Sequence, residues 1–222
     1  MPDTFDNRLA RQVDEYIERL FVPRDSALEQ GLTDAEQAGL TAISVSPSEG
    51  KLLYLIAKMA GAKRVLEIGT LGGYSTTWLA RALPAGGRVV TLELEQRHAD
   101  VARRNVDRAG VGERIEIRVG PAADTLRDMI ERGEAPFDLI FIDAEKKGYV
   151  EYLDLSIRLA HPGTLILADN VIRRAMAPTP GDEDSRGILE FNEAVAAHSR
   201  LESLILPIIR ENLDGLSISI VR

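Results

Sequence analysis

From Arg64 onward, short apolar runs alternate with longer segments in which apolar residues recur at helical spacing. The runs lie at residues 65–68, 89–92, 115–119, 139–142 and 164–168. A repeated order of strand, turn and helix is typical of a parallel sheet that is wound in both directions and covered by helices on both faces. The sequence therefore predicts an α/β fold with a doubly wound sheet.

The two ends of the chain differ from this pattern. Before Arg64, apolar residues three and four positions apart predict helices that cover the sheet, and Thr33 is expected to cap one of them. After the strand-and-helix repeat, two further apolar runs lie at residues 201–206 and 216–221. The short polar link 210–214 lies between them, just before the second run. Because this link cannot hold a crossover helix, we expect the last strand to be antiparallel to its neighbour.

Composition limits the class of protein. With 222 residues, 45% of them hydrophobic, and no linker rich in Pro, Gly or Ser, we expect a single domain, with 1–60 as a helical cover and 61–222 as the core. The sequence has no Cys, which suits a reducing compartment, so we expect a cytoplasmic location. From the pattern of apolar and basic residues we expect neither a leader nor a membrane span. A net charge of −8 disfavours nucleic acid as a partner.

Charged residues begin where the buried strand Phe137–Ile142 ends. In open α/β sheets ligands bind outside the carboxyl ends of the strands, so Asp143, Glu145 and Lys146 should face the crevice. The next strand ends in Asp169-Asn170, and two carboxylates with an amide oxygen suit Mg²⁺ or Ca²⁺. The alternative is that the two acids only cap turns.

A glycine-rich turn, Glu67 to Ser75, follows the first strand but lacks the G-x-G-x-x-G spacing of dinucleotide sites. Glu67 at its mouth would repel a pyrophosphate and attract a cation. Glu93 ends the second strand, where a carboxylate can bind both ribose hydroxyls, although a solvated acid is the alternative. We therefore expect a cofactor with a nucleoside and a positive charge but no phosphates.

Four motifs together resemble the cation-dependent S-adenosylmethionine O-methyltransferases of caffeoyl-CoA and catechol type. They are Leu66–Thr70 with Gly73–Ser75, Phe141–Lys146, Ala168–Val171 and Asp214–Leu216. The similarity runs from about Val45 to the C-terminus. It implies a Rossmann-like methyltransferase sheet, mostly parallel with an antiparallel last strand, and a homodimer.

The resemblance also implies roles for individual residues. Those matching S-adenosylmethionine contacts are Val45, Glu67, Gly69, Ser75, Glu93, Ala122, Asp143 and Glu145. Those matching ligands of a divalent cation, Mg²⁺ before Ca²⁺ or Mn²⁺, are Asp143, Asp169 and Asn170. Lys146 matches the catalytic lysine, and Lys147 is interpreted as a solvated neighbour. The sequence departs from the catechol type at Ala122 and Ala123, where polar residues would contact the adenine.

The resulting hypothesis is metal-dependent methyl transfer to a hydroxyl of a small catechol-like or vicinal-diol acceptor. Alternatives are O-methylation of a modified tRNA nucleoside and a non-catalytic S-adenosylmethionine-binding protein. The segment 172–186 is expected to be a binding loop, in which Arg173 and Arg174 hold an acidic substrate tail or form a solvated charge pair. The three histidines, His98, His161 and His198, show no ligand spacing and are interpreted as surface or turn residues.

Overall fold

A computed structural model describes residues 7–209 and 213–222, which contain a seven-stranded sheet in the order β3-β2-β1-β4-β5-β7-β6. Strands β1 to β5 pair in parallel, and β7 pairs antiparallel with both β5 and β6. The strands are β1 (Arg64–Ile68), β2 (Arg88–Glu93), β3 (Ile115–Val119), β4 (Phe137–Ile142), β5 (Ala160–Ala168), β6 (Leu201–Ile209) and β7 (Leu213–Val221). The predicted doubly wound sheet and its antiparallel last strand are confirmed; within the predicted link, residues 210–212 lie outside the described residues.

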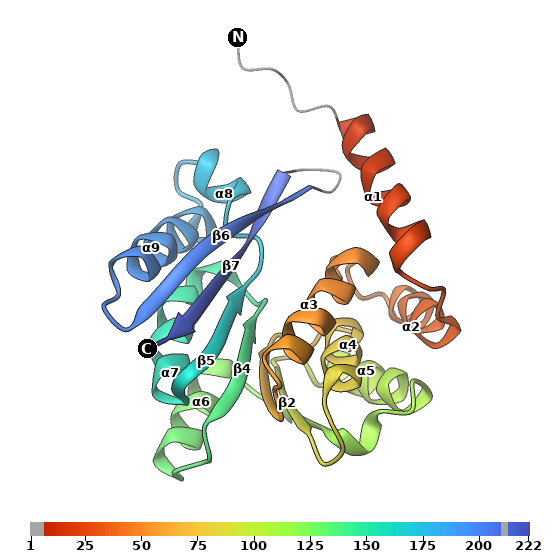
Figure 1. The fold of residues 1–222 in the computed structure, drawn as a ribbon, viewed down its shortest axis with the longest axis horizontal. Coiled ribbons are helices and arrows are strands. Elements are labelled where there is room, and N and C mark those ends of the chain that lie inside the picture. The colour runs from red at the N-terminus through yellow and green to blue at the C-terminus, as the bar shows by residue number, and fades with distance from the viewer. Residues whose placement is uncertain (1–6, 210–212) are drawn as a thin grey trace.

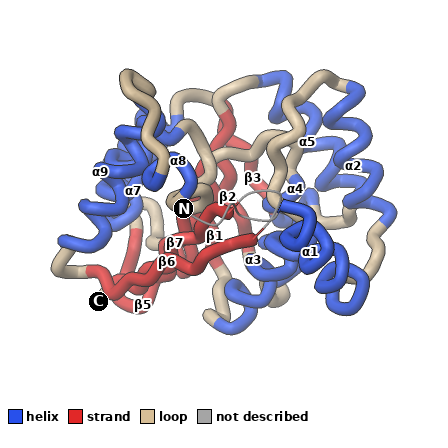
Figure 2. Tube along the Cα trace, turned by 90° about the horizontal axis from the view of Figure 1, so that it is seen from above, coloured by secondary structure: helices blue, strands red, loops and turns tan. Residues whose placement is uncertain are grey.

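Helices cover both faces of the sheet (Figures 1 and 2), with α3, α4 and α5 on one side and α6, α7 and α9 on the other. The helices are α1 (Asn7–Phe21), α2 (Ser26–Gln37), α3 (Pro47–Met59), α4 (Tyr74–Ala82), α5 (Gln96–Arg108), α6 (Ala122–Glu131), α7 (Tyr149–Arg158), α8 (Arg173–Met176) and α9 (Glu183–Ala197), with the 3₁₀ turns η1 (Gly112–Arg114) and η2 (Lys146–Gly148). No helix among these is long and apolar enough to cross a bilayer, as judged over the described residues.

Strand β4 shows how the sheet separates two apolar cores. Ile140 and Ile142 pack among residues of α6, α7 and α9, whereas Leu139 and Phe141 pack among residues of α3 and α4. Successive side chains of a strand point to opposite faces, so a strand covered on both faces reads as one unbroken apolar run. This arrangement places β4 in the centre of the sheet, with its charged end at the carboxyl edge.

Two local predictions were wrong. Thr33 does not cap a helix, because α2 begins earlier, where Asp25 accepts hydrogen bonds from the backbone N–H groups of Ala27 and Leu28; the Thr33 hydroxyl bonds back to Glu29 within the helix. The segment 172–186 is not one continuous loop. It contains α8 and the first turn of α9, which is capped by the Asp182 side chain.

Candidate active site

One large cavity, with a volume of about 960 Å³, opens at the carboxyl ends of β1, β2, β4 and β5. Its walls come from residues that directly follow these strands, from the start of α6 and from the segment before α3. The predicted site residues that line it are Val45, Gly69, Ser75, Glu93, Ala122, Asp143, Glu145, Lys146 and Asn170. The fold thus brings together groups from six separate parts of the sequence.

Gly69 joins the cofactor side of the cavity to the metal side. Its φ of +102° is a conformation that residues with a side chain rarely adopt, and a Cβ built there would lie 2.0 Å from the Asp143 carbonyl oxygen. The backbones that leave β1 and β4 therefore touch at this point, since Ile68 and Ile142 are already register partners. Only glycine allows this approach.

Glu93 is buried and holds the glycine turn in place. One carboxylate oxygen accepts from the backbone N–H of Leu71 at 2.7 Å and of Thr70 at 3.3 Å, and the other accepts from Glu95 at 3.0 Å. The Nδ1 atom of His98 lies 3.3 Å from that second oxygen, and His98 lines the cavity. Sequence reasoning missed His98, although its place in the first turn after a strand end was a usable signal.

The sequence suggested that Glu67 lies at the mouth of the turn, and this prediction is wrong. Glu67 is fully buried behind the cavity wall, where Ser75 and Thr91 donate to it at 2.6 Å each and Thr76 donates as well. Burial raises the pKa of Glu67 to about 7, against the opposing effect of these hydroxyl groups. Of its three hydroxyl partners, Ser75 lines the cavity and so connects Glu67 to the cavity wall.

The candidate metal ligands meet because β4 and β5 are parallel neighbours with Ile142 opposite Ala168. Asp143 and Asn170 line the large cavity, and the buried Asp169 lines a smaller hollow beside it. Burial, followed by the negative charge of Asp143, raises the pKa of Asp169.

Asn170 completes this set in an unusual conformation. Its φ of +60° lies in the left-handed region, which asparagine tolerates better than most residues. Its amide nitrogen donates to the Asp169 carboxylate at 3.2 Å, which leaves the amide oxygen as the atom that can serve a cation. Two crowded carboxylates and an amide oxygen are hard ligands, so the residues present fit a divalent cation.

Lys146 is buried, whereas Lys147 is exposed. The Lys146 ammonium donates to the Asp143 carboxylate at 3.0 Å and to the Tyr149 hydroxyl at 2.5 Å. Burial lowers the pKa of Lys146, but Tyr149 and Asp143 outweigh it, and the net effect raises the pKa above its usual value. Burial thus acts in the direction that favours a lysine base, but the contacts with Tyr149 and Asp143 act against it more strongly.

Two further residues at the cavity were missed. The Tyr152 hydroxyl donates to the Glu145 carboxylate, and both side chains line the cavity. Asp214 accepts from the backbone N–H groups of Ile172, Arg173 and Gly215, and it also lines the cavity. Tyr152 comes one helical turn after η2, and Asp214 stands in a recognised motif, but neither position revealed its partner.

The two arginines after Asn170 have carboxylate partners within the protein. Arg174 pairs with Asp182 at 2.9 Å and with Asp184 at 3.7 Å, while Arg173 lies 3.6 Å from Asp214. Arg174 thus has two carboxylates of the chain itself to neutralise its charge. This arrangement favours the charge-pair interpretation for Arg174 over an acidic substrate tail.

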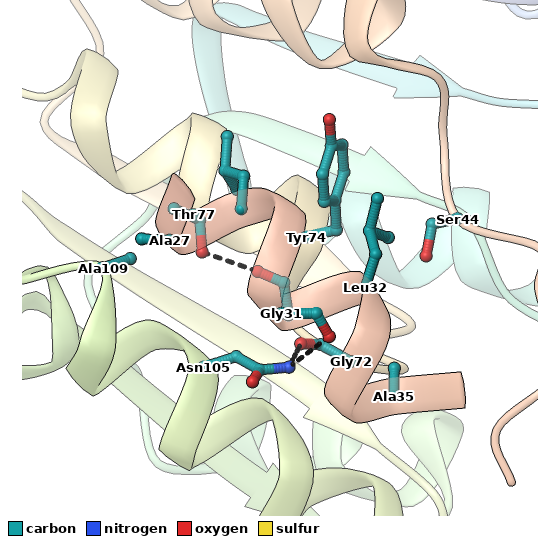
Figure 3. A pocket seen from close by; sticks show the side chains of 12 residues that line it. Ala27, Gly31, Leu32, Ala35, Ser44, Gly72, Tyr74, Thr77, Asn105 and Ala109 are labelled. Carbon is teal, nitrogen blue, oxygen red and sulfur yellow. Dashed lines mark hydrogen bonds between the residues drawn. The ribbon is translucent and has the colours of Figure 1, made fainter. Parts of the chain in front are cut away.

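Another small hollow, separate from the two above, lies between α2, α4 and α5 (Figure 3). Asn105 of α5 reaches across it and donates to the carbonyl oxygens of Gly31 in α2, at 3.1 Å, and Gly72 in the glycine turn, at 2.9 Å (Figure 3). Its volume of about 10 Å³ leaves no room for an organic ligand. The hollow is a packing junction that connects the N-terminal helices to the turn.

The strand order, the glycine turn after β1, the acid that ends β2 and the cavity at the carboxyl edge define a Rossmann-like methyltransferase sheet. Residues 23–219 match the family model described as O-methyltransferase, so the chain belongs to the O-methyltransferase family.

Individual relatives support the same family assignment. The chain is 44% identical over 219 residues to the catechol O-methyltransferase of Niastella koreensis, covering 97% of this chain and 99% of that one. It is 33% identical to the caffeoyl-CoA O-methyltransferase of Petroselinum crispum, over 75% of this chain and 73% of that one. The crystal structure of the O-methyltransferase from Bacillus cereus in complex with SAH superposes with a TM-score of 0.94 at 42% identity, covering 97% and 100% of the two chains. The resemblance read from the sequence is confirmed at this level.

Proposed function

We propose that this O-methyltransferase moves the methyl group of S-adenosylmethionine to one hydroxyl of a small catechol-like or other vicinal-diol acceptor, and that it needs a divalent cation, Mg²⁺ before Ca²⁺ or Mn²⁺. The observation that carries this proposal is the juxtaposition of Asp143, Asp169 and Asn170 with the buried Lys146 at the ends of β4 and β5. A protein that only bound S-adenosylmethionine would not need Asp169, Asn170 or Lys146.

The cofactor half of the proposal rests on the shape and chemistry of the large cavity. Its volume of about 960 Å³ lies at the upper end of the ~300–1,000 Å³ typical of small-molecule sites, which suits two ligands side by side. One Glu93 carboxylate oxygen already accepts from both Thr70 and Leu71, whereas the other accepts one backbone N–H, from Glu95, and has a further lone-pair direction for a ribose hydroxyl. Ala122 and Ala123 offer an apolar wall to the base. The Bacillus cereus relative was solved with SAH, which remains when S-adenosylmethionine has given up its methyl group.

The acceptor half rests on the residues that would hold the cation. Asp143, Asp169 and Asn170 would bind it, and the remaining coordination positions would be open to oxygens of the acceptor. A bound cation would lower the pKa of an acceptor hydroxyl and would offset the negative charge of Asp143 beside Lys146. Lys146 would take the hydroxyl proton on Nζ, and the walls of the cavity would hold the oxyanion in line with the methyl group.

The proposal is tested by an acceptor screen with labelled S-adenosylmethionine. Catechols and matched monohydroxy compounds are compared in the presence of Mg²⁺ and after addition of a chelator. We expect transfer to at least one catechol with Mg²⁺, loss of transfer with the chelator, and no transfer to the monohydroxy analogue. Undiminished transfer in the chelator would refute the metal requirement, and a failure with every diol would refute the acceptor class.

The base is tested by Lys146→Ala, with Lys58→Ala on the exposed side of α3 as a matched control. We expect kcat to fall roughly 100-fold or more in the first variant, the range of general-base contributions, and to stay unchanged in the second. Normal turnover by Lys146→Ala would remove the lysine from the mechanism while leaving the cation site standing.

The cofactor site is tested by Glu93→Gln. The amide would place an N–H group against backbone donors that now meet a carboxylate, and it would offer one acceptor fewer to the ribose. We expect SAH to bind roughly ten-fold more weakly by calorimetry, in line with the loss of one charge-assisted hydrogen bond. Unchanged affinity would show that Glu93 only stabilises the turn.

A homodimer is also proposed, supported by the outer face of α1. This face exposes large apolar side chains: Leu9 by 57%, Tyr16 by 55% and Leu20 by 53%. An apolar face of this kind on one helix marks an interaction surface. Light scattering should give twice the mass of the 24.4 kDa chain, and a monomer would contradict the proposal.

A further inference from the structure

Tyr149 is the first residue of α7 and stands three positions after Lys146. It is fully buried beneath the floor of the site, and its ring packs edge-on against Phe191 of α9 with the centroids 5.3 Å apart and the planes at 74°. Helix α9 can press this closely because Gly187 lies against the backbone of Lys146, where a Cβ would come within 2.5 Å of the Lys146 carbonyl oxygen. The ring of Tyr149 is therefore held in place by its packing against α9.

The hydroxyl of this tyrosine touches three parts of the site at once. It lies 2.5 Å from the Lys146 Nζ, 3.0 Å from the backbone carbonyl oxygen of Asp169 and 3.3 Å from that of Ile142. An ammonium can only donate, so the phenol oxygen accepts from Lys146 and its own proton goes to a carbonyl. The Ile142 carbonyl already accepts from the Asp169 N–H at 3.0 Å, so Asp169 is the better acceptor for this proton.

We propose that Tyr149 is a positioning residue that holds the Lys146 Nζ at the place where it meets the acceptor. This inference rests on the proposed role of Lys146 as base. The lysine has two polar anchors, Asp143 and Tyr149, and the proposed function gives Asp143 to the cation. The Tyr149 hydroxyl is then the anchor that remains, and the carbonyl of Asp169 fixes it to the strand that carries the other metal ligands.

A proton relay through Tyr149 does not fit the geometry. Its side chain is not part of the cavity wall and is fully buried, so the hydroxyl has no contact with solvent through which a proton could leave. Its proton is engaged by a main-chain carbonyl oxygen, which cannot pass it on. The tyrosine therefore acts through the placement of Lys146 and takes no proton itself.

The test is a double-mutant cycle of Tyr149→Phe and Lys146→Ala, with Tyr54→Phe as a matched control. The Tyr54 hydroxyl also accepts from a lysine, Lys58, at 3.3 Å, but on the exposed side of α3. Tyr149→Phe removes one oxygen atom and keeps the ring in its packing. Rates, the acceptor KM, the affinity for SAH by calorimetry and the thermal midpoint are measured for each variant.

We expect Tyr149→Phe to lower kcat about ten-fold, as for a lost hydrogen bond to a charged group, with the acceptor KM and the SAH affinity within about two-fold of wild type. In the Lys146→Ala background the same substitution should lower kcat no further, because the group that it positions is gone. The control should match wild type throughout.

Two results would overturn the inference alone: wild-type kcat in Tyr149→Phe when Lys146→Ala is impaired, or an equal loss in both backgrounds, which is what a purely structural role gives. Normal turnover in Lys146→Ala would instead overturn the proposed base and this inference together. If Tyr149→Phe fails to fold, the test uses Phe191→Leu instead, which removes the packing partner of the Tyr149 ring but keeps the Tyr149 hydroxyl. Its effect on kcat must then also vanish in the Lys146→Ala background, and persistence of the effect would refute the positioning role.

Discussion

Replacing Gly69 with alanine tests whether the contact between the ends of β1 and β4 shapes the site. The built Cβ lies 2.0 Å from the Asp143 carbonyl oxygen and 2.8 Å from its carbonyl carbon, and both atoms belong to backbone that cannot rotate away. Because Cβ contacts below 3.0 Å are essentially never found, either the segment at Gly69 or the segment at Asp143 must move by roughly 1 Å or more. Asp143, a proposed metal ligand, would move with it.

The expected effects have two parts that can be separated. Alanine at a φ of +102° costs roughly 1–3 kcal/mol of backbone strain, and the displaced contact adds to that cost. A misplacement of about 1 Å can lower a rate by roughly 100-fold, so we expect kcat to fall by about that factor. The free energy of unfolding should fall by more than the strain alone would require.

Gly163→Ala is the matched control for this prediction. Gly163 has a similar φ of +95°, but a Cβ there would meet nothing within 4 Å, and the residue lies in β5 far from the carboxyl edge. It should lose only the strain of roughly 1–3 kcal/mol, measured by urea unfolding, and keep its methyl-transfer rate. If Gly69→Ala lost no more stability than Gly163→Ala and kept its kcat, the contact would not organise the site.

Two further predictions concern stability. The carbonyl of the following proline and the Asp138 carboxylate raise the pKa of His161, so its contribution is present below the unfolded value of about 6.5 and is lost as pH rises through the folded value. Since the His161 side chain is 39% exposed and its ion pair is screened by solvent, His161→Asn should cost less than about 1 kcal/mol near pH ~5.5 and nothing near pH ~9, measured by urea unfolding; an equal cost at both would contradict this. Asn105→Leu removes a hydrogen bond to the buried carbonyl of Gly72 and another to the partly buried carbonyl of Gly31, and it should lower the free energy of unfolding by about 2–3 kcal/mol, whereas Gln96→Leu on the same helix, at an exposed position, should change it little.

The strands and the edge at which the site lies could be predicted because both depend on local pattern. A strand covered on both faces is a continuous apolar run, and the polar residue that follows it must leave the sheet at its edge. Asp143 and Asp169 were therefore expected at one edge, and the parallel pairing of β4 and β5 confirms it. The division into a cover of residues 1–60 and a core of residues 61–222, and the roles of the site residues, stay predictions.

Helix boundaries and side-chain partners depended on what lies nearby in space. The start of α2 was misplaced because Asp25 as well as Thr33 belongs to the residue types that cap helices, and Asp25 also pairs with Arg81 of α4 at 2.6 Å. Glu67 was expected at the mouth of the turn, yet its side chain is buried against α4 and β2. The hydroxyl groups that hold it there come from α4 and β2. The sequence around Glu67 contains no pattern that predicts these partners.

The sequence by itself determined the order of the elements, the antiparallel end of the sheet and the residues that leave each strand, since these follow from periodicity and from short links. Only the tertiary structure decided which of those residues share a contact. His98 beside Glu93, and Tyr149 between Lys146 and the carbonyl of Asp169, are joined by the packing of helices against the sheet. Periodicity assigns a side chain to a face of its element, whereas its partners are set by distances of a few ångströms between chain segments.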